Sequence, residues 1–100
     1  MDSINSQKLY ELLSQIPKGR VTTYKELAQK LKTKGYRAVG QIVGANPNAP
    51  KTPCHRVVRS DGGLGGYAFG LPKKIEILAK EGVKISDGKV VDFDKKFYKF

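Results

Sequence analysis

The only cysteine and the only histidine of this 100-residue chain stand side by side, as Cys54 and His55. A thiolate is a strong nucleophile and a histidine carries protons near neutral pH, so the pair could support nucleophilic chemistry. Pro53 suits the start of a short helix, and Arg56 and Arg59 add positive potential that favours the thiolate. Cysteine also occurs as a small buried apolar residue, and neighbours on an extended strand point to opposite faces. The dipeptide alone therefore leaves catalysis and core packing open.

The charge of the chain indicates its class of partner. Lys and Arg number 19 against 9 Asp and Glu, a formal net charge of +10. On a small domain this field favours a polyanion, nucleic acid first, with a merely lysine-rich soluble surface as the alternative. The hydrophobic share of 39% is enough for a globular fold, and 100 residues fit one domain.

The composition also indicates the cellular compartment of the protein and whether it binds a metal. A lone cysteine cannot form an internal disulfide, which favours a reducing compartment. No apolar run has membrane-spanning length, and the start of the chain lacks a signal-peptide core. We therefore expect a cytoplasmic protein. No cluster of Cys, His and carboxylates has metal-ligand spacing, so we expect no metal site.

The residues before the Cys-His pair predict helices. Apolar residues at helical spacing predict a first helix between Ser6 and Pro17. These residues are Leu9, Leu12, Leu13 and Ile16. A capping box of Thr23 and Glu26 begins a second helix that runs through Leu31.

A third helix is predicted over "YRAVGQIVGANP", ending before Pro47. Its predicted inward residues are Ala38, Ile42 and Val43. Two short helices around the turn "TKG" favour a helix-turn-helix, a corner that many small helical domains also contain.

The second half of the chain mixes loops with one helix and a hairpin. "NPNAPK" reads as a loop, and the glycine-rich "SDGGLGGYAFG" reads as irregular. "LPKKIEILAKEG" predicts a helix with Pro72 in its first turn and Gly82 at its end. Alternation around Asp87-Gly88 predicts a hairpin, and the role of the basic-aromatic tail stays open. The expected fold is α/β, mostly α: a winged-helix-like DNA-binding domain with a helix-turn-helix and a small C-terminal hairpin.

Several of these motifs together resemble one family. "PCHRVV", preceded by "RAVGQIVGANP" and followed by "SDGGLGGYAFG" and "LAKEG", is similar to the active domain of O6-alkylguanine-DNA alkyltransferases. The resemblance runs from about Ile16 to Val83, and the order and spacing of its motifs are more specific than the Cys-His pair. It implies a single catalytic and DNA-binding domain over residues 1–100, without the N-terminal domain that is common in the family.

The resemblance implies direct repair of DNA. Cys54 would take the alkyl group, methyl above all, from O6 of guanine and keep it as a thioether, in a single turnover with no cofactor. His55 would pass the thiol proton through water towards Glu81. Asn46 would order the loop that leads to the cysteine, and the hydroxyl of Tyr24 would donate to N3 of the departing guanine. Without the resemblance, Glu81 reads as a helix-end charge, Asn46 as a helix cap and Tyr24 as a core residue.

The implied partner is double-stranded DNA whose damaged base is flipped out. Arg37 would enter the base stack from the minor groove, and the small Ala38 and Gly40 would allow close approach. The contacts to the DNA backbone that the resemblance implies are Lys25, Lys32 and Ser60. The alternative for Arg37 is a phosphate contact, which is still DNA binding.

The implied base pocket departs from the family in one place. Its residues would be Tyr67, Ala68, Phe69 and Val57. The family often has Ser-Gly-Gly where this chain has Ala68-Phe69-Gly70. We hypothesise that Phe69 changes the tolerance for bulky adducts such as benzyl.

Other functions remain as alternatives. Alkyltransferase-like proteins share the scaffold but usually carry tryptophan at the cysteine position and sense damage without repairing it. A winged-helix regulator with a redox-sensitive Cys54 leaves Asn46 and Glu81 without a role. A cysteine hydrolase lacks any sign of an acyl substrate. We expect a monomer.

Overall fold

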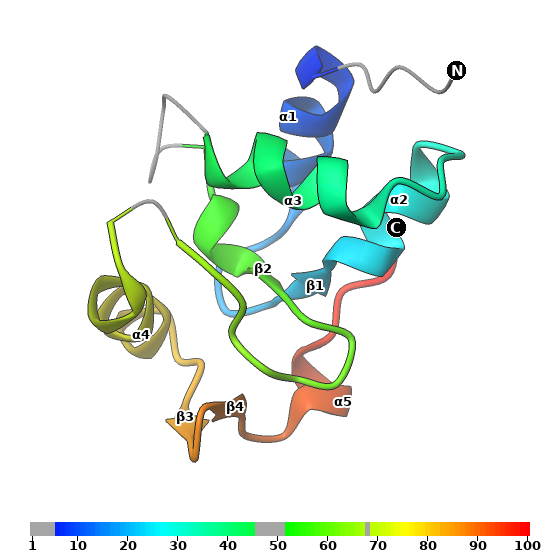
Figure 1. Ribbon diagram of the computed structural model, residues 1–100. Helices are drawn as coiled ribbons and strands as arrows, with labels where there is room; N and C mark the ends of the chain where they lie inside the picture. The colour runs from blue at the N-terminus through cyan, green and yellow to red at the C-terminus, as the bar shows by residue number, and fades with distance from the viewer. Residues whose placement is uncertain (1–5, 46–51, 68) are drawn as a thin grey trace.

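The computed structural model describes residues 6–45, 52–67 and 69–100 (Figure 1). Within these ranges the chain is mostly helical, with short strands between the helices. The elements in chain order are α1 (Ser6–Gln15), β1 (Thr22–Thr23), α2 (Tyr24–Lys30), α3 (Tyr36–Gly44), the 3-10 helix η1 (Cys54–Arg56), β2 (Val57–Val58), α4 (Leu71–Lys80), β3 (Ile85–Ser86), β4 (Lys89–Val90) and α5 (Phe93–Lys96). The expected fold class is confirmed.

The first two helices follow their sequence signals. α1 buries the predicted leucine stripe and ends before Pro17. α2 begins at the predicted N-cap, where the Thr23 hydroxyl oxygen accepts a hydrogen bond from the Glu26 backbone N–H at 3.0 Å. This bond satisfies one of the N–H groups that the first turn of a helix leaves without a partner.

The turn after α2 leads directly into α3, and the two helices pack against each other (Figure 1). The predicted pair of short helices is therefore confirmed. One inward position was predicted wrongly, because Val39 and not Ala38 enters the core at the start of α3. Val39 and Val43 are both buried and lie one turn apart on the same helix face, whereas Ala38 is half-buried beside that face.

A pair of very short parallel strands joins the helical half to the Cys-His segment. β1 pairs with β2 in the register Thr22↔Val57 and Thr23↔Val58. Tyr24 directly follows β1, and Cys54 and His55 directly precede β2. The parallel pairing thus fixes α2 relative to the Cys-His pair, although 30 or so residues separate them in sequence.

α4 ends as its sequence predicts. Gly82 has a φ of +90°, its N–H donates to Ala79, and the N–H of Val83 donates to Leu78. These paired bonds form a Schellman motif, with buried Val83 in the hydrophobic position that accompanies it. Glu81 is the last residue before this left-handed turn, so the motif fixes where its side chain begins.

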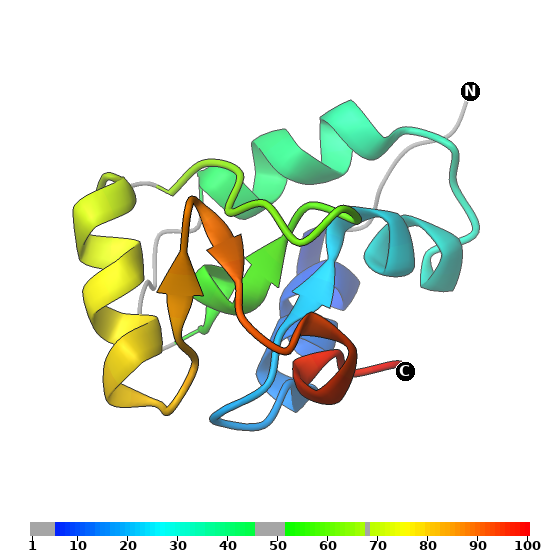
Figure 2. The ribbon, with the colours of Figure 1, turned by 90° about the horizontal axis from the view of Figure 1, so that it is seen from below.

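The predicted hairpin is confirmed as β3 and β4, with Ile85 opposite Val90. Both turn residues, Asp87 and Gly88, have positive φ, as a two-residue type I′ turn requires. Seen from below, α4 lies at the opposite end of the molecule from α2, and the hairpin lies beside α4 on its inner side (Figure 2).

Two hydrophobic clusters lie on the two sides of the short parallel strands. The first joins α1, α2, α3, η1 and Val57, and the second is made of Val21, Val58, Leu64, Leu78, Val83 and Val90. Cys54 belongs to the first cluster. Among the residues described, no helix is both long and apolar enough to span a lipid bilayer.

Candidate active site

Cys54 opens η1 and is only 2% exposed. Pro53 is its N-cap, so the predicted short helix at the Cys-His pair is confirmed. The tight turn prevents the strand-like alternation in which Cys54 and His55 would point to opposite faces. Both side chains are buried, on the inner side of the segment that leads into β2.

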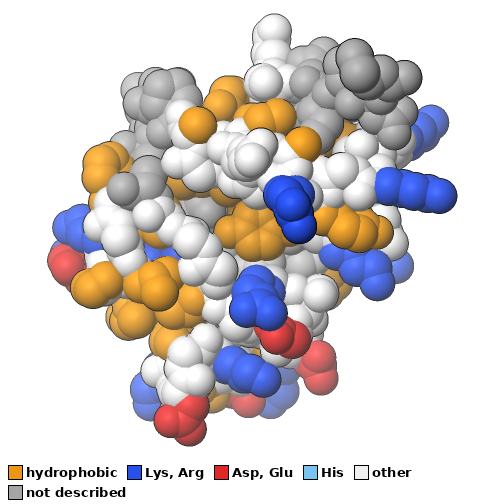
Figure 3. All heavy atoms as spheres, in the orientation of Figure 1, with side chains coloured by type: hydrophobic (Ala, Val, Ile, Leu, Met, Phe, Trp, Pro, Cys, Tyr) orange, Lys and Arg blue, Asp and Glu red, His pale blue; other side chains and the backbone are white. Residues whose placement is uncertain are grey.

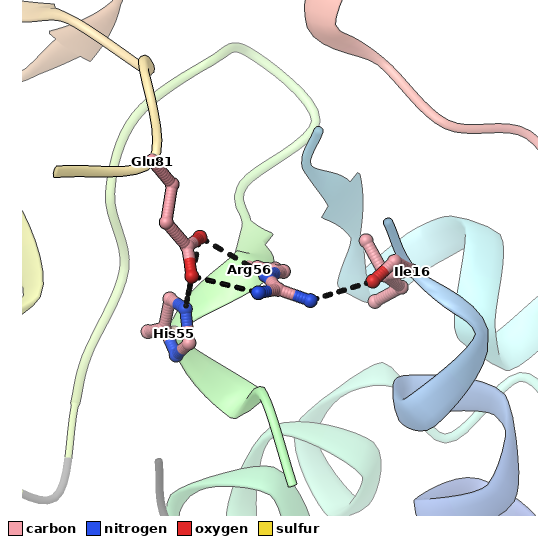
Figure 4. Close-up of polar contacts among 4 residues, drawn as sticks. All are labelled: Ile16, His55, Arg56 and Glu81. Carbon is pink, nitrogen blue, oxygen red and sulfur yellow. Dashed lines mark hydrogen bonds and ion pairs between the residues drawn. The ribbon is translucent and has the colours of Figure 1, made fainter. Parts of the chain in front are cut away.

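His55 is held by Glu81, which comes from the end of α4. Its Nε2 lies 3.1 Å from both carboxylate oxygens of Glu81. Arg56 binds the same carboxylate in a bidentate way, with Nε at 3.0 Å and a terminal nitrogen at 2.7 Å. The remaining guanidinium nitrogen donates to the carbonyl of Ile16 at the end of α1 (Figure 4). Arg56 thus joins three segments that are distant in sequence, those of Ile16, His55-Arg56 and Glu81.

The charges of this cluster fix the protonation of His55. Burial opposes ionisation of Glu81, but its hydrogen bonds to Arg56 and His55 outweigh burial and lower the pKa of the carboxyl group. Burial lowers the pKa of His55, and Glu81 offsets this only in part. At neutral pH a neutral imidazole therefore faces a carboxylate. Because a carboxylate only accepts, Nε2 carries the proton and Nδ1 is left as an acceptor.

The Nδ1 atom of His55 is buried and has no hydrogen-bond partner among the described residues. It is therefore available to take a proton from a neighbouring group, directly or through water. The hydroxyl of Tyr67 is also buried and has no hydrogen-bond partner among the described residues. The rings of His55 and Tyr67 meet edge to face, with their centroids 6.4 Å apart. Polar atoms of this kind are rare in interiors and mark places where another group binds or reacts.

Tyr24, the first residue of α2, lies between two glycines. A Cβ atom on Gly65 would stand 2.9 Å from the Tyr24 hydroxyl oxygen, and one on Gly40 would stand 3.9 Å from its ring. Burial raises the pKa of Tyr24, and negative charge on Cys54 raises it further, against a smaller opposite effect of the Gly66 backbone. The phenol therefore stays protonated at neutral pH and can act as a hydrogen-bond donor.

An open cavity of about 840 Å³ lies beside these residues. It is lined by Tyr24, Tyr36, Arg37, Gly40, Gly44, Arg59, Gly66 and Tyr67. Tyr24 and Tyr67 also pack against the cluster that contains Cys54, so two residues of the cavity wall adjoin the core that holds the thiol, although Cys54 does not itself line the cavity. A cavity of this size accommodates a nucleobase with its substituent.

The structure reveals one buried charge that the sequence reasoning missed. Lys74 of α4 is completely buried, and its Nζ donates to the carbonyls of Val57 at 2.8 Å, Leu64 at 2.5 Å and Gly66 at 3.1 Å. Burial lowers its pKa to about 8, while charge on Cys54 acts in the opposite direction. Lys74 therefore ties β2 to the glycine-rich segment that carries Tyr67 and places a positive charge near Cys54.

The predicted contacts to the DNA backbone and the predicted pocket residue Phe69 lie at the surface. Lys25 and Ser60 are exposed and line a smaller cavity next to the first one, whereas Lys32 is exposed in the turn after α2 and lines neither. Phe69 is 60% exposed, and its ring meets that of Tyr67 edge to face at 5.6 Å.

Val57 does not line the cavity, contrary to prediction. As part of β2 its side chain is fully buried in the core, and its carbonyl is the group that contacts Lys74. Asn46 and Ala68 lie outside the described residues. Within the described part of the chain, no three His, Cys, Asp or Glu side chains gather closely enough to hold a metal ion.

Comparison with known proteins connects this geometry to one family. The family model described as "6-O-methylguanine DNA methyltransferase, DNA binding domain" matches residues 5–83. The chain is 44% identical over 93 residues to a bifunctional methyltransferase/endonuclease of Picrophilus torridus, covering 92% of this chain and 30% of that protein. The chain thus spans well under two thirds of the length of this curated relative.

Solved structures give the same relationship. The O6-methylguanine-DNA methyltransferase of Pyrococcus kodakaraensis superimposes with a TM-score of 0.72 at 43% identity, over 78% of this chain and 46% of that one. Schizosaccharomyces pombe Atl1, solved with damaged DNA containing O6-carboxymethylguanine, superimposes with a TM-score of 0.82 at 26% identity. That match covers 95% of this chain and 94% of Atl1.

Proposed function

Because the chain belongs to the family of 6-O-methylguanine DNA methyltransferase DNA-binding domains, we propose that it repairs O6-alkylguanine in double-stranded DNA by transferring the alkyl group to Cys54. The observation that carries the proposal is that buried Cys54 directly precedes His55 in one short helix, while Nδ1 of His55 has no partner among the described residues and its Nε2 is held by Glu81. A nucleophile, a proton acceptor and an orienting carboxylate are the parts that activation of a thiol requires.

In the proposed reaction the proton of Cys54 moves to Nδ1 of His55, directly or through one water molecule. The sulfur attacks the alkyl carbon, a carbon–sulfur bond forms and the bond from that carbon to O6 breaks. Glu81 stabilises the imidazolium that results, and Arg56 keeps the carboxylate in place. The thioether has no ready leaving group, so each molecule acts once.

Guanine leaves with the electrons of the broken bond as an anion. Tyr24 is suited to donate a hydrogen bond to N3 that stabilises this charge, because its raised pKa keeps the phenol protonated and it lines the cavity. The guanine anion then takes up a proton from water, and the imidazolium of His55 releases one, so no net charge is left behind. The proposed reaction uses no cofactor.

DNA binding is supported by charge and by the cavity. The net charge of +10 favours a polyanion, and Arg37 and Gly40 of α3 lie on the cavity wall. A base inside a duplex cannot reach a buried thiol, so the damaged nucleotide has to be flipped out into the cavity. We assign to Arg37 the place in the stack that this base vacates, approached from the minor groove.

One experiment tests the transfer. A duplex containing O6-methylguanine is incubated with the protein and the intact mass is measured. We expect a gain of one methylene, stoichiometric with protein and located on Cys54. The Cys54→Ala variant should bind the duplex and gain no mass. An unchanged mass of the parent protein would refute the transfer.

The second candidate function is damage sensing without transfer. The specific observation in its favour is the match to Atl1, whose length the chain covers almost completely. Binding of the O6-methylguanine duplex in preference to an undamaged one, with no change in mass, would establish this alternative.

We propose that Phe69 limits the size of the adducts that the protein accepts. Phe69 does not line the cavity itself, but its exposed ring meets the ring of Tyr67, which does, so it lies beside the path of a large adduct. We expect Phe69→Gly to raise the transfer rate for O6-benzylguanine relative to O6-methylguanine by about tenfold, roughly the discrimination that one or two pocket groups provide. Equal changes in both single-turnover rates would contradict the role of Phe69.

A further inference from the structure

Two residues of the cavity wall have no part in the proposed chemistry. Tyr36 opens α3 and is 46% exposed, which is unusual for an aromatic side chain. Arg59 follows β2 in the turn that leads to the glycine-rich segment, and its side chain is 65% exposed. Its closest ion-pair partner is Asp61 at 3.6 Å, in an exposed pair of the kind that contributes little.

Both residues stand where two cavities meet. The large cavity and a smaller one of about 220 Å³ share Tyr24, Tyr36 and Arg59 in their walls. The smaller cavity continues to Lys25 and Ser60. Because they share these walls, we treat the two cavities as one groove, with Tyr67 in its larger part and Ser60 in its smaller part. Over α3 and the loop after β2, Figure 3 shows basic side chains next to apolar ones.

The chemistry of the groove changes along its length. The part near Tyr67 and Gly66 is lined by aromatic rings and small residues, which suits a flat base. The part near Arg59, Lys25 and Ser60 is lined by cations and a hydroxyl group, which are typical ligands of a sugar–phosphate backbone. The ring of Tyr36 stands on the wall that both parts share.

The backbone holds Arg59 in place. The N–H of Arg59 donates to Gly63 at 2.7 Å, and the N–H of Gly62 donates back to Arg59 at 2.9 Å. Asp61 accepts from the N–H of Gly63 at 2.8 Å, which closes the turn. The guanidinium group is therefore presented from a fixed turn and keeps its hydrogen-bond donors for another ligand.

We propose that Arg59 and Tyr36 hold the sugar and phosphate of the flipped nucleotide, with Arg59 paired to its phosphate and the ring of Tyr36 packed against its deoxyribose. This inference rests on the proposed function, because it takes a flipped base in the large cavity as its starting point. Arg59 and Tyr36 would contact the flipped nucleotide itself, whereas Arg37 would fill the place that this nucleotide leaves in the base stack. Tyr36 and Arg59 thereby favour the flipped state over the stacked one.

The test measures binding in a Cys54→Ala background, where no alkyl transfer takes place. Dissociation constants are compared for a duplex with one O6-methylguanine and for the same duplex with guanine, over a series of salt concentrations. For Arg59→Gln we expect about tenfold weaker binding of the damaged duplex and a salt slope smaller by about one phosphate contact. The undamaged duplex should lose less than threefold, because its bases stay stacked.

Tyr36→Ala should weaken binding of the damaged duplex about five- to tenfold and leave the salt slope unchanged, since the ring carries no charge. Tyr36→Phe should retain the affinity. Arg20→Gln is the matched loss of one arginine that lines neither cavity, and it should affect both duplexes alike and weakly.

Equal losses on the two duplexes, or a loss no larger than that of Arg20→Gln, would overturn the inference for Arg59. An unchanged affinity of Tyr36→Ala would overturn it for Tyr36. The intact-mass assay on protein with Cys54 present decides the proposed alkyl transfer separately, so the two failures are distinguishable.

Discussion

At the scale of single residues, the proposed reaction depends on a neutral histidine that Glu81 holds and that can accept the proton of the thiol. Burial sets the pKa of His55 below its ordinary value, and Glu81 limits that shift. Above this pKa Nδ1 is open and can take the proton of Cys54. As the pH falls through it, Nδ1 becomes protonated and the acceptor is lost. The rate of transfer should therefore stay level until the pH is below about 6.5, the ordinary pKa of histidine, and then fall.

Glu81→Gln tests this arrangement. The amide oxygen can still accept from Nε2, but the charge that raises the pKa of His55 and stabilises the imidazolium is gone. We expect the plateau of the single-turnover rate to fall about 10- to 100-fold and its acidic limb to move to lower pH. Glu76→Gln, an exposed carboxylate on α4, is the control and should leave both unchanged. A lower plateau with an unmoved limb would point to a structural role alone.

The burial of Lys74 was not predicted from the sequence. Lysines in amphipathic helices usually face solvent, yet α4 buries Lys74 with Leu78 one turn away and leaves Leu71 and Ile75 exposed. The sequence does contain one indication of this burial, because Lys74 lies four residues before Leu78 and therefore on the same face of the helix. The partners that reverse the usual preference are backbone carbonyls, and a sequence pattern does not display them.

Lys74→Met should act on stability and on the thiol together. Removing the ammonium leaves buried carbonyls without a donor, and we expect a loss of about 1–3 kcal/mol in the free energy of unfolding. Loss of the positive charge near Cys54 should also raise the pKa of the thiol. The measurement is the pH dependence of Cys54 alkylation by iodoacetamide, at a temperature where the variant is folded. A less stable variant with an unshifted thiol profile would limit Lys74 to its structural contacts.

At the scale of elements, the structures that could be predicted best are those specified by short local sequence motifs. The capping box at Thr23, the glycine after α4 and the Asp87-Gly88 turn each produced the predicted structure, because each depends on a few adjacent residues. The contacts that assemble the site join distant segments. The approach of Tyr24 to Gly65 and the meeting of Arg56 with Ile16 could not be predicted from periodicity. The family resemblance supplied what local patterns lacked, by naming Glu81 and Tyr24 as partners of Cys54.

The glycine-rich segment should tolerate substitution very unevenly. Gly65 has a φ of +69°, and a Cβ atom there would lie 2.9 Å from the hydroxyl oxygen of Tyr24. Gly65→Ala should therefore destabilise the protein by about 1–3 kcal/mol and slow alkyl transfer at least tenfold by displacing the phenol. Gly66→Ala is the matched control for stability alone, since nothing lies within 4 Å of its added Cβ atom, but Gly66 lines the cavity. Thermal unfolding and single-turnover rates measure the two effects of Gly65→Ala, and an equal loss of stability in the two variants would contradict the close approach.

At the scale of the whole molecule, the C-terminal tail packs against the segment around β1, near the start of the chain. The N–H of Tyr98 donates to Val21 at 2.7 Å, the N–H of Val21 donates to Lys96 at 2.9 Å, and the hydroxyl of Thr22 donates to Tyr98 at 3.0 Å. The tail therefore lies along β1, on which β2 also pairs. Tyr98 and Phe100 meet edge to face at 5.2 Å and pack against the cluster that includes Cys54.

We expect the tail to act on the site only through the stability of the molecule, and a short truncation tests this. Deleting residues 98–100 removes two packed aromatic rings and the hydrogen bonds to β1, for an expected loss of about 2–4 kcal/mol. In a domain of this size that lowers Tm by about 10–20 °C. Well below the new Tm, the transfer rate should stay within about threefold of the parent, because no residue of this segment lines the large cavity. Lys99→Ala, an exposed side chain, should change neither quantity. A truncated protein with an unchanged Tm and a slow transfer would instead place the tail in the reaction itself.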